Sequence, residues 1–309
     1  MFSLLFPGQG SQIVGMAKDF YSNLDYVKEY FSEADDILKK KLSKIILDGP
    51  KEELEKTENT QPSIFLVSYS IFNVIKKETD FNLSRAQYYA GHSLGEYSAL
   101  CCAEALTFEQ TINLLKHRGI AMQNAVPNGD GGMVAILGVD INEINEIIKN
   151  NKNEFTCYIA NDNSIGQIVV SGKIESLELF CLELKKKNFK YIKLPVSSPF
   201  HCPLMNSATN EMKQRIKDTD FKEPKVSIMS NVTASPTNNS DEIKKLLVDQ
   251  IEKPVRWRES VINMIKLDIN HFIEIGPGKV LSGLVKRINR NVKLNQINTF
   301  DDIKNLTND

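Results

Sequence analysis

A serine between two glycines, placed between a strand-like run and a helix-like run, constrains this chain more than any other feature. Residues 86–90 are strand-like, Gly91-His92-Ser93-Leu94-Gly95 follows, and residues 96–100 are helix-like. This is the G-x-S-x-G pattern of a nucleophile elbow, in the context that the pattern requires. Glycines let neighbouring backbone pass close to a strained turn, so we expect the Ser93 hydroxyl to project into a cleft. The alternative to a nucleophile elbow is a chance match to the pattern, in which the residues only cap a helix.

Composition indicates a globular protein with a sizeable core. The chain has 309 residues, of which 41% are hydrophobic, and its 38 basic and 39 acidic side chains nearly cancel. No overall field therefore favours nucleic acid or a membrane surface as a partner. Its five cysteines lack a C-x-x-C pair, which argues against a disulfide framework and a zinc site. The first residues do not resemble an export signal, so we expect reduced thiols and a cytoplasmic location.

The first part of the chain has an α/β pattern. Residues 2–6 predict a buried strand, a Gly8 turn follows, and residues 12–21 are amphipathic. Pro62 is expected to begin an apolar helix. Thr107 and Gln110 have the spacing of a capping box, which predicts a helix that ends near residue 125.

The pattern of predicted strands and helices changes between residues 127 and 197. Strand-like and helix-like runs occur there in the order β-α-β-β-α-β, at 133–137, 141–148, 155–159, 168–170, 174–187 and 189–194. This order is typical of a ferredoxin-like unit. We therefore expect an inserted subdomain at 127–197 and a large subdomain made of 1–126 and 198–309. The second segment of the large subdomain is expected to hold a helix at 203–216, a strand at 226–229, helices at 241–250 and 255–265, a strand at 271–275 and a last helix at 279–288.

A serine nucleophile needs a general base, and the chain has four histidines. His201 lies in a two-proline loop where the insert returns to the large subdomain, and loops at such junctions often carry catalytic groups. His92 lies in the elbow itself and is expected to pack beneath the turn. His117 in mid-helix and His271 at a strand start fit solvated or core roles.

The third member of a triad stays open. Asp241, Asp249 and Glu274 lie in the right half of the chain, but a backbone carbonyl could also orient the imidazole. Cys202 is next to His201, yet we reject a cysteine nucleophile because sequence neighbours rarely aim their side chains at each other.

The other glycine-rich turn, Gly8-Gln9-Gly10, matches neither nucleotide-binding signature. A dinucleotide fingerprint would need glycine or alanine at Ile13, and a phosphate-binding loop would need lysine at Met16. It is either a simple turn or a second source of oxyanion donors. Arg118 is either a solvated arginine or a clamp for a substrate carboxylate. Lysine and arginine clusters at 185–193 and 286–290 read as solvated faces, or as contacts for an acidic protein if they flank the cleft.

Together these residues resemble the malonyl-CoA:acyl carrier protein transacylases, relatives of the acyltransferase domains of fatty-acid and polyketide synthases. The resemblance covers nearly the whole chain. It rests on Phe6-Pro7-Gly8-Gln9-Gly10-Ser11-Gln12, Gly91-His92-Ser93-Leu94-Gly95-Glu96, Arg118-Gly119 with Met122-Gln123, Ala160-Asn161 with Gly166-Gln167, Pro199-Phe200-His201, Ser230-Asn231-Val232, Gln250 with Pro254-Val255-Arg256-Trp257, and Glu274-Ile275-Gly276-Pro277-Gly278.

The resemblance implies an α/β-hydrolase-like core with a ferredoxin-like insert. It also implies that Ser93 is acylated, that His201 is the base, and that the Gln9 and Leu94 amides form the oxyanion hole. In the same way, Arg118 would bind the malonyl carboxylate, and the Gln250 main-chain carbonyl would orient the histidine. The substrate pocket would include Met122, Asn161, Phe200 and Asn231, and the bulk of Phe200 resembles malonyl-selective members.

The implied activity is transfer of malonyl from malonyl-CoA to the phosphopantetheine thiol of acyl carrier protein, which supplies fatty-acid synthesis. Malonyl-CoA would be a substrate, no metal or other cofactor would be needed, and the carrier would be an acidic, transient partner. We expect a monomer, because the sequence has no heptad repeat and no exposed apolar stripe that a second chain would cover. The rival readings are a serine hydrolase, and a carrier-binding module without catalysis.

Overall fold

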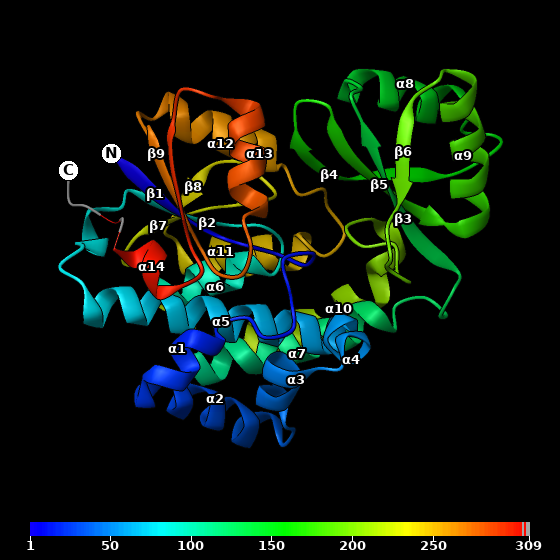
Figure 1. Cartoon of the computed structure of the whole chain (residues 1–309). Helices are drawn as coiled ribbons and strands as arrows, with labels where there is room; N and C mark the ends of the chain where they lie inside the picture. The colour runs from blue at the N-terminus through cyan, green and yellow to red at the C-terminus, as the bar shows by residue number, and fades with distance from the viewer. Residues whose placement is uncertain (305, 307–309) are drawn as a thin grey trace.

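Two β-sheets organise the structure, a computed structural model that describes residues 1–304 and 306 (Figure 1). The larger sheet has the strand order β10-β9-β1-β2-β7-β8. Its strands are β1 (Phe2–Phe6), β2 (Tyr88–Gly91), β7 (Ser227–Met229), β8 (Pro236–Thr237), β9 (His271–Ile275) and β10 (Lys293–Ile297). All neighbouring pairs are parallel except β7 and β8. The chain thus has a mixed α/β fold, as the first part of the sequence predicted.

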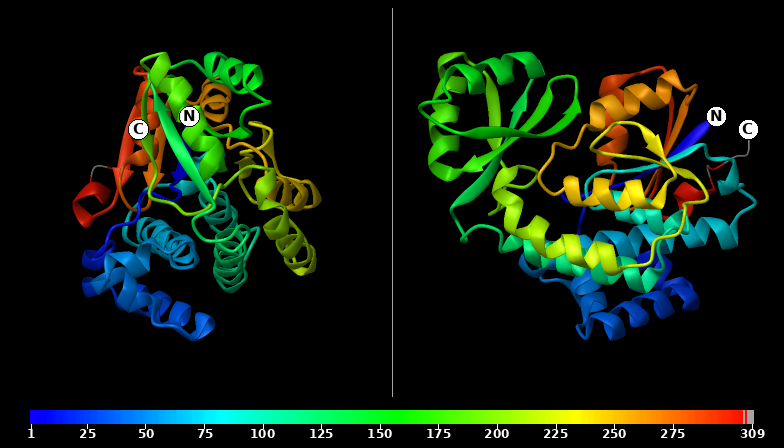
Figure 2. Two further views of the ribbon diagram at one scale, coloured as in Figure 1. Left: turned by 90° about the vertical axis from the view of Figure 1, so that its right-hand side faces the viewer. Right: turned by 180° about the vertical axis from the view of Figure 1, so that it is seen from behind.

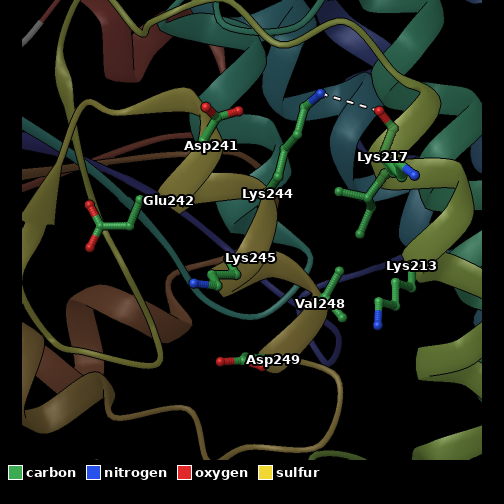
Figure 3. Close-up of a pocket in the computed structure, with 9 residues that line it drawn as sticks. Lys213, Lys217, Asp241, Glu242, Lys244, Lys245, Val248 and Asp249 are labelled. Atoms are coloured by element: carbon green, nitrogen blue, oxygen red, sulfur yellow. Dashed lines mark hydrogen bonds between the residues drawn. The ribbon is translucent and has the colours of Figure 1, made fainter.

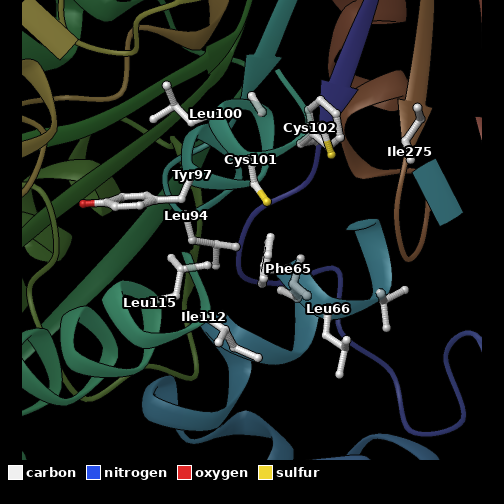
Figure 4. Close-up of a cluster of buried hydrophobic side chains, with 14 of the residues drawn as sticks. Phe65, Leu66, Leu94, Tyr97, Leu100, Cys101, Cys102, Ile112, Leu115 and Ile275 are labelled. Carbon is white, nitrogen blue, oxygen red and sulfur yellow. The ribbon is translucent and has the colours of Figure 1, made fainter. Parts of the chain in front are cut away.

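Helices cover both faces of the large sheet, because alternate residues of a strand point to opposite faces. Leu4 and Phe6 of β1 pack into a core with α5 (Thr57–Glu78), α6 (Gly95–Cys102) and α7 (Phe108–Gln123). Leu5 faces the other way, toward α12 (Trp257–Lys266) and α13 (Val280–Ile288). Figure 4 shows the first core where the elbow helix meets α5 and α7, with Phe65, Leu66, Leu94, Tyr97, Leu100, Ile112 and Leu115.

The smaller sheet has the strand order β4-β5-β3-β6 and is antiparallel throughout. Its elements are β3 (Gly131–Leu137), α8 (Ile141–Asn150), β4 (Cys157–Ser164), β5 (Gln167–Lys173), α9 (Ile174–Lys186) and β6 (Lys190–Lys193). Side chains of α8 and α9 form a core of their own with this sheet. Figure 1 and the right-hand view of Figure 2 show the small sheet to one side of the large sheet. The six elements occur in the order that the sequence predicted.

The region between the first strand and the elbow differs from the sequence-based expectation. The predicted amphipathic stretch 12–21 is a run of turns followed by the short helix α1 (Lys18–Asn23). The helices α2 (Asp25–Leu38), α3 (Leu42–Asp48) and α4 (Lys51–Glu55) then follow, and none of them was predicted.

The helix α5 begins at Thr57, five residues before Pro62, where the sequence placed its start. The polar side chains of its first turns are buried, and two of them donate hydrogen bonds to main-chain carbonyls of α4. Asn59 Nδ2 donates to the Glu53 carbonyl at 2.7 Å, and Thr60 Oγ1 donates to the Leu54 carbonyl at 2.6 Å. Because these partners come from another helix, a local pattern could not reveal them.

The second half of the large sheet follows the predicted order but extends further. The helices α10 (Asn206–Asp218), after a 3₁₀ turn at Pro203–Met205, and α11 (Ser240–Asp249) lie at the expected places. The expected last helix, α13, is followed by β10 and by α14 (Phe300–Ile303). Within the described residues no helix is long and apolar enough to cross a membrane. All five cysteines are free and buried.

Strand β4 joins the small sheet to the segment that leads into α12. Val255 N donates to the Ala160 carbonyl at 2.9 Å, and Asp162 N donates to the Val255 carbonyl at 3.0 Å. The Asp162 carboxylate, 2% exposed, also pairs with Arg258 of α12 at 2.8 Å. These contacts hold β4 against the start of α12.

Two helical glycines give opposite predictions for the same substitution. A Cβ on Gly119 of α7 would lie 2.7 Å from the Thr57 carbonyl oxygen, whereas a Cβ on Gly283 of α13 would meet no atom within 4 Å. We expect Gly119→Ala to lower the free energy of unfolding by about 1–3 kcal/mol through overpacking. Gly283→Ala is expected to raise it by about 0.5–1 kcal/mol, because alanine is the better helix former. Urea denaturation measures both, and a Gly119→Ala protein as stable as the wild type would contradict the close approach of α5 and α7.

Candidate active site

Ser93 stands on the turn between β2 and α6 in a left-handed backbone conformation, with a φ of 52°. The turn has no room for side chains at its two glycines. A Cβ on Gly91 would lie 1.9 Å from the Gly95 carbonyl carbon, and a Cβ on Gly95 would lie 2.2 Å from the Phe6 carbonyl oxygen. The glycines thus let the turn pack on β1 and on itself, and this holds Ser93 in its uncommon conformation.

His201 lies within hydrogen-bond distance of the serine, with Nε2 at 2.9 Å from Ser93 Oγ. It belongs to the loop after β6 and also has a left-handed backbone, with a φ of 59°. Its Nδ1 lies 2.7 Å from the main-chain carbonyl oxygen of Gln250. Since a carbonyl only accepts, Nδ1 carries the hydrogen and Nε2 is free to accept from the serine hydroxyl.

Burial, and next to it the Arg118 guanidinium, lowers the pKa of His201 to about 3. The imidazole is therefore neutral over the whole physiological range, which is the protonation state that a general base needs.

Arg118 reaches the same serine from α7. It is 1% exposed, and its Nη2 donates to Ser93 Oγ at 3.1 Å and to Gln250 Oε1 at 2.8 Å. Its Nη1 donates to Gln61 Oε1 at 2.7 Å, while Nε has no partner among the described atoms. A buried guanidinium with an unmet donor beside a nucleophile can bind an anionic group.

Sequence reasoning missed Gln61. It lies directly before Pro62, where the sequence placed the start of the helix. The signal lay in three consecutive amide and hydroxyl side chains, Asn59, Thr60 and Gln61, immediately before an apolar helix.

Gln9 and Leu94 place two main-chain amides beside Ser93. Both residues line the same cavity as the serine, and neither amide donates a hydrogen bond to another described residue. The Gly8 loop packs directly on the elbow, since a Cβ on Gly8 would lie 2.5 Å from the His92 carbonyl oxygen. Two N–H groups that line the Ser93 cavity and lack partners among the described residues are donors of the kind that an oxyanion hole uses.

The cavity at Ser93 has a volume of about 150 Å³ and lies between the two sheets. Its lining residues are Gln9, Gln61, His92, Ser93, Leu94, Arg118, Met122, Met133, Asn161, Asn163, Val169, Leu194, Val196, Phe200 and His201. The small sheet supplies apolar wall at Met133 and Val169. A space of this size, with polar groups at one end, suits a short acyl chain.

A larger groove of about 660 Å³ lies elsewhere, between α10 and α11 (Figure 3). Lysine and acidic side chains dominate its lining, with Lys244 donating to the Lys217 carbonyl at 3.3 Å. It contains no serine or histidine. The chemistry therefore belongs to the smaller cavity.

Of the four residues expected in the substrate pocket, Met122, Asn161 and Phe200 line the cavity. Asn231, the fourth, is not among the residues that line this cavity. Its Oδ1 accepts from the Ser93 amide at 2.7 Å and its Nδ2 donates to the Gly91 carbonyl at 2.7 Å. Both ends of the side chain are thus used to hold the elbow from behind, which leaves it outside the cavity lining.

The other histidines take no part in activating the serine. His92 packs against Trp257, with 5.6 Å between ring centroids, and its Nε2 lies 2.8 Å from Asn163 Oδ1. His117 lies within α7, and His271 pairs with Asn295 at 2.7 Å on the sheet.

The acidic candidates for a third member lie elsewhere too. Glu274 accepts from the Leu281 and Ser282 amides at the start of α13, and Asp241 and Asp249 belong to α11 and line the groove of Figure 3. The carbonyl of Gln250 takes the orienting position instead.

One carboxylate behind the elbow was not singled out from the sequence. Glu96, in the first turn of α6, is 3% exposed, and its Oε2 accepts from Gln250 Nε2 at 2.7 Å and from Asn231 N at 3.1 Å. Burial raises the pKa of Glu96 to about 7.

Comparison with known proteins places this geometry in a family. The family model described as an acyl transferase domain matches residues 3–300. This chain belongs to that family. It is 42% identical to the malonyl CoA-acyl carrier protein transacylase of Bacillus subtilis over 294 residues, which are 94% of this chain and 91% of the relative.

Solved structures of the same family superpose closely. An acyl-carrier-protein-S-malonyltransferase from Bartonella henselae has a TM-score of 0.95 and 40% identity, covering 98% of this chain and 97% of that one. A type II PKS acyl-carrier protein in complex with its malonyl-transacylase has a matching chain with a TM-score of 0.94 and 36% identity, covering 98% of this chain and 97% of that one.

The described residues contain no group of three or more histidine, cysteine, aspartate or glutamate side chains that could hold a metal ion. Hydrogen-bonding and charged side chains of the protein itself surround Ser93.

The environment of Cys202 gives a test against a cysteine nucleophile. Burial raises the pKa of its thiol to about 12, and the sulfur donates to the Pro199 carbonyl at 3.0 Å. Because alkylating reagents attack the thiolate, we expect iodoacetamide at neutral pH to leave the native protein unmodified and active. The unfolded protein in urea serves as the control and reacts at all five cysteines by mass spectrometry. Rapid native alkylation of Cys202 with loss of activity would contradict this reading.

Proposed function

We propose that this protein transfers a malonyl group from malonyl-CoA to the phosphopantetheine thiol of acyl carrier protein, through a malonyl ester of Ser93, and so supplies fatty-acid synthesis. The observation that carries the proposal is that His201 Nε2 and Arg118 Nη2 both lie within 3.1 Å of the Ser93 hydroxyl oxygen. The names of the relatives reported above support the donor and the acceptor.

In the first half-reaction, Ser93 Oγ attacks the thioester carbonyl while its proton passes to His201 Nε2. The Gln9 and Leu94 amides stabilise the oxyanion that forms. Collapse of this intermediate breaks the carbon–sulfur bond, and His201 returns the proton to the leaving thiolate of coenzyme A. The Gln250 carbonyl holds the protonated imidazole through Nδ1.

In the second half-reaction the carrier thiol takes the place of coenzyme A. His201 removes the thiol proton, the sulfur attacks the ester carbonyl, and Ser93 leaves with the proton returned from His201. The related complex of a malonyl-transacylase with an acyl-carrier protein supports a carrier protein as acceptor. No step of this scheme calls for a metal ion or a further cofactor.

Arg118 selects the donor in this scheme. The malonyl carboxylate would pair with the guanidinium, whose buried Nε lacks a partner among the described atoms. A neutral acyl group would leave that donor unsatisfied, which costs free energy in a buried site. Met122 and Phe200, which line the cavity, would limit branching next to the carboxylate.

The same proposal covers the architecture and setting of the protein. We assign residues 1–126 and 198–309 to an α/β-hydrolase-like subdomain and 127–197 to a ferredoxin-like insert, which the strand orders of the two sheets support. The carrier would be an acidic partner that binds transiently. The protein would be a monomer in the cytoplasm, and the five free, buried thiols support a reducing compartment.

The Arg118 assignment predicts a loss of discrimination. We expect Arg118→Ala to lower kcat/KM for malonyl-CoA by about a hundredfold or more, because removing one partner of a buried charge pair costs about 3–5 kcal/mol. The value for acetyl-CoA is expected to change far less. Arg215→Ala, on the exposed face of α10, is the matched control and should behave as the wild type. An unchanged malonyl-to-acetyl ratio in Arg118→Ala would overturn the assignment.

The covalent intermediate predicts a mass change confined to one residue. Incubation with malonyl-CoA should add one malonyl group to the wild type and none to Ser93→Ala, by intact mass spectrometry. Adding holo acyl carrier protein should move the label onto the carrier. Label released as free malonate instead would support the serine hydrolase, and no adduct on either protein would leave only a carrier-binding module.

A further inference from the structure

Two buried, oppositely charged side chains at this site are joined by a third residue. Arg118 is 1% exposed and Glu96 is 3% exposed. Arg118 Nη2 donates to Gln250 Oε1 at 2.8 Å, and Gln250 Nε2 donates to Glu96 Oε2 at 2.7 Å. The proposed transfer reaction uses Arg118 but assigns no part to Glu96.

Glu96 fixes the orientation of the Gln250 amide. An ionised carboxylate only accepts, so the NH₂ group of Gln250 points to Glu96 and the carbonyl oxygen points to Arg118. Glu96 Oε2 also accepts from the Asn231 amide at 3.1 Å, and the Asn231 side chain holds the Ser93 amide. Because both bonds to Glu96 end on Oε2, a proton on Oε1 breaks neither.

We propose that Glu96 is a positioning residue and the resident counter-charge of Arg118, and that it takes up one proton from solvent when the carboxylate of the acyl donor pairs with Arg118. This inference rests on the proposed function, since it requires an anionic acyl group.

The physical reason is charge balance in a dry site. Without substrate, one guanidinium and one carboxylate balance through Gln250. A malonyl carboxylate adds a second negative charge near the same guanidinium, and like charges at close range disfavour ionisation of one of them. Glu96 is suited to respond, because burial already raises its pKa to about 7.

The ionisable groups around Glu96 do not titrate in the same range. The pKa of Tyr97, on the same helix, is raised to about 12 by burial, that of His201 is lowered to about 3, and that of His92 is lowered from 6.5. The strands β1 and β7 carry no ionisable side chain, β2 carries only tyrosines, and Arg118 of α7 is the one charged side chain that shifts the pKa of Glu96. The ionisable residues of α5 contribute no shift.

The sign of the pH dependence follows. Glu96 is protonated below about pH 7, so the donor carboxylate then meets no competing charge. Above pH 7 binding must first protonate Glu96, and malonyl-CoA should bind more weakly, by about tenfold for each unit by which the donor raises the pKa of Glu96. A Glu96→Gln protein mimics the protonated form at every pH.

The test is titration calorimetry of malonyl-CoA into Ser93→Ala protein, which cannot be acylated, between about pH 6 and pH 8.5 and in two buffers of different ionisation enthalpy. We expect proton uptake near pH 7.5 and an affinity that falls toward pH 8.5. Adding Glu96→Gln should abolish the uptake, leave the affinity at pH 6 unchanged, and give tighter binding than Ser93→Ala alone at pH 8.5. Acetyl-CoA, which has the same coenzyme A phosphates but no carboxylate, should show no uptake by this group.

A buried carboxylate remote from Arg118 provides the matched control. Glu274→Gln in the same background should keep the uptake of the parent, because within the described residues Glu274 bonds the start of α13 and Arg118 does not shift its pKa. Glu96→Gln that weakens binding equally at all pH values would mean a structural role, and uptake that survives in Glu96→Gln would place the proton elsewhere; either result overturns the inference. If malonyl-CoA fails to acylate wild-type Ser93 at any pH, the proposed function itself is wrong.

Discussion

The hydrogen bonds of Gln250 are the constraint on which the rest of the site depends. Its main-chain carbonyl accepts a hydrogen bond from His201 Nδ1, and its side-chain oxygen accepts one from Arg118 Nη2. Its side-chain nitrogen donates to Glu96 Oε2 and, at 3.2 Å, to the Ser93 carbonyl. One residue at the end of α11 thereby positions His201, Arg118 and Ser93 relative to one another. A networked polar cluster of this kind is rigid only while every member has its partner.

The fold supports this network by holding two residues in an uncommon backbone conformation. Ser93 and His201 both have positive φ, which costs about 1–3 kcal/mol at a non-glycine residue. The surrounding packing outweighs this cost. The elbow is pressed against β1 at Gly95 and is held from behind by Asn231, while the His201 loop is tied to β5 through Ser171 Oγ, which donates to the Phe200 carbonyl at 2.6 Å.

Local patterns predicted what depends on local physics. The elbow, the Thr107 and Gln110 capping box and the six elements between residues 127 and 197 follow from short-range spacing, and the structure has them. The helices between residues 25 and 55 and the early start of α5 were missed, because their polar residues bond partners on other helices. For the same reason the sequence predicted no role for Gln61 or Glu96, and it did not show that the Asn231 side chain bonds the elbow. A buried amide or carboxylate is recognised by its partners, which the sequence alone does not show.

The position of the small sheet bears on which acceptor reaches the acyl group. Met133, Val169, Leu194 and Val196 present apolar surface to a cavity of about 150 Å³, and β4 is held to α12 by the pair between Asp162 and Arg258. Such a wall replaces water next to Ser93 with hydrocarbon, so an ester there meets few hydrolytic water molecules. In the proposed reaction, the carrier thiol displaces water from this cavity when it reaches the ester. The nucleophile, base and oxyanion donors of the proposed reaction need not differ from those of a hydrolase, and the apolar wall from the second sheet is the feature that would favour transfer to a thiol.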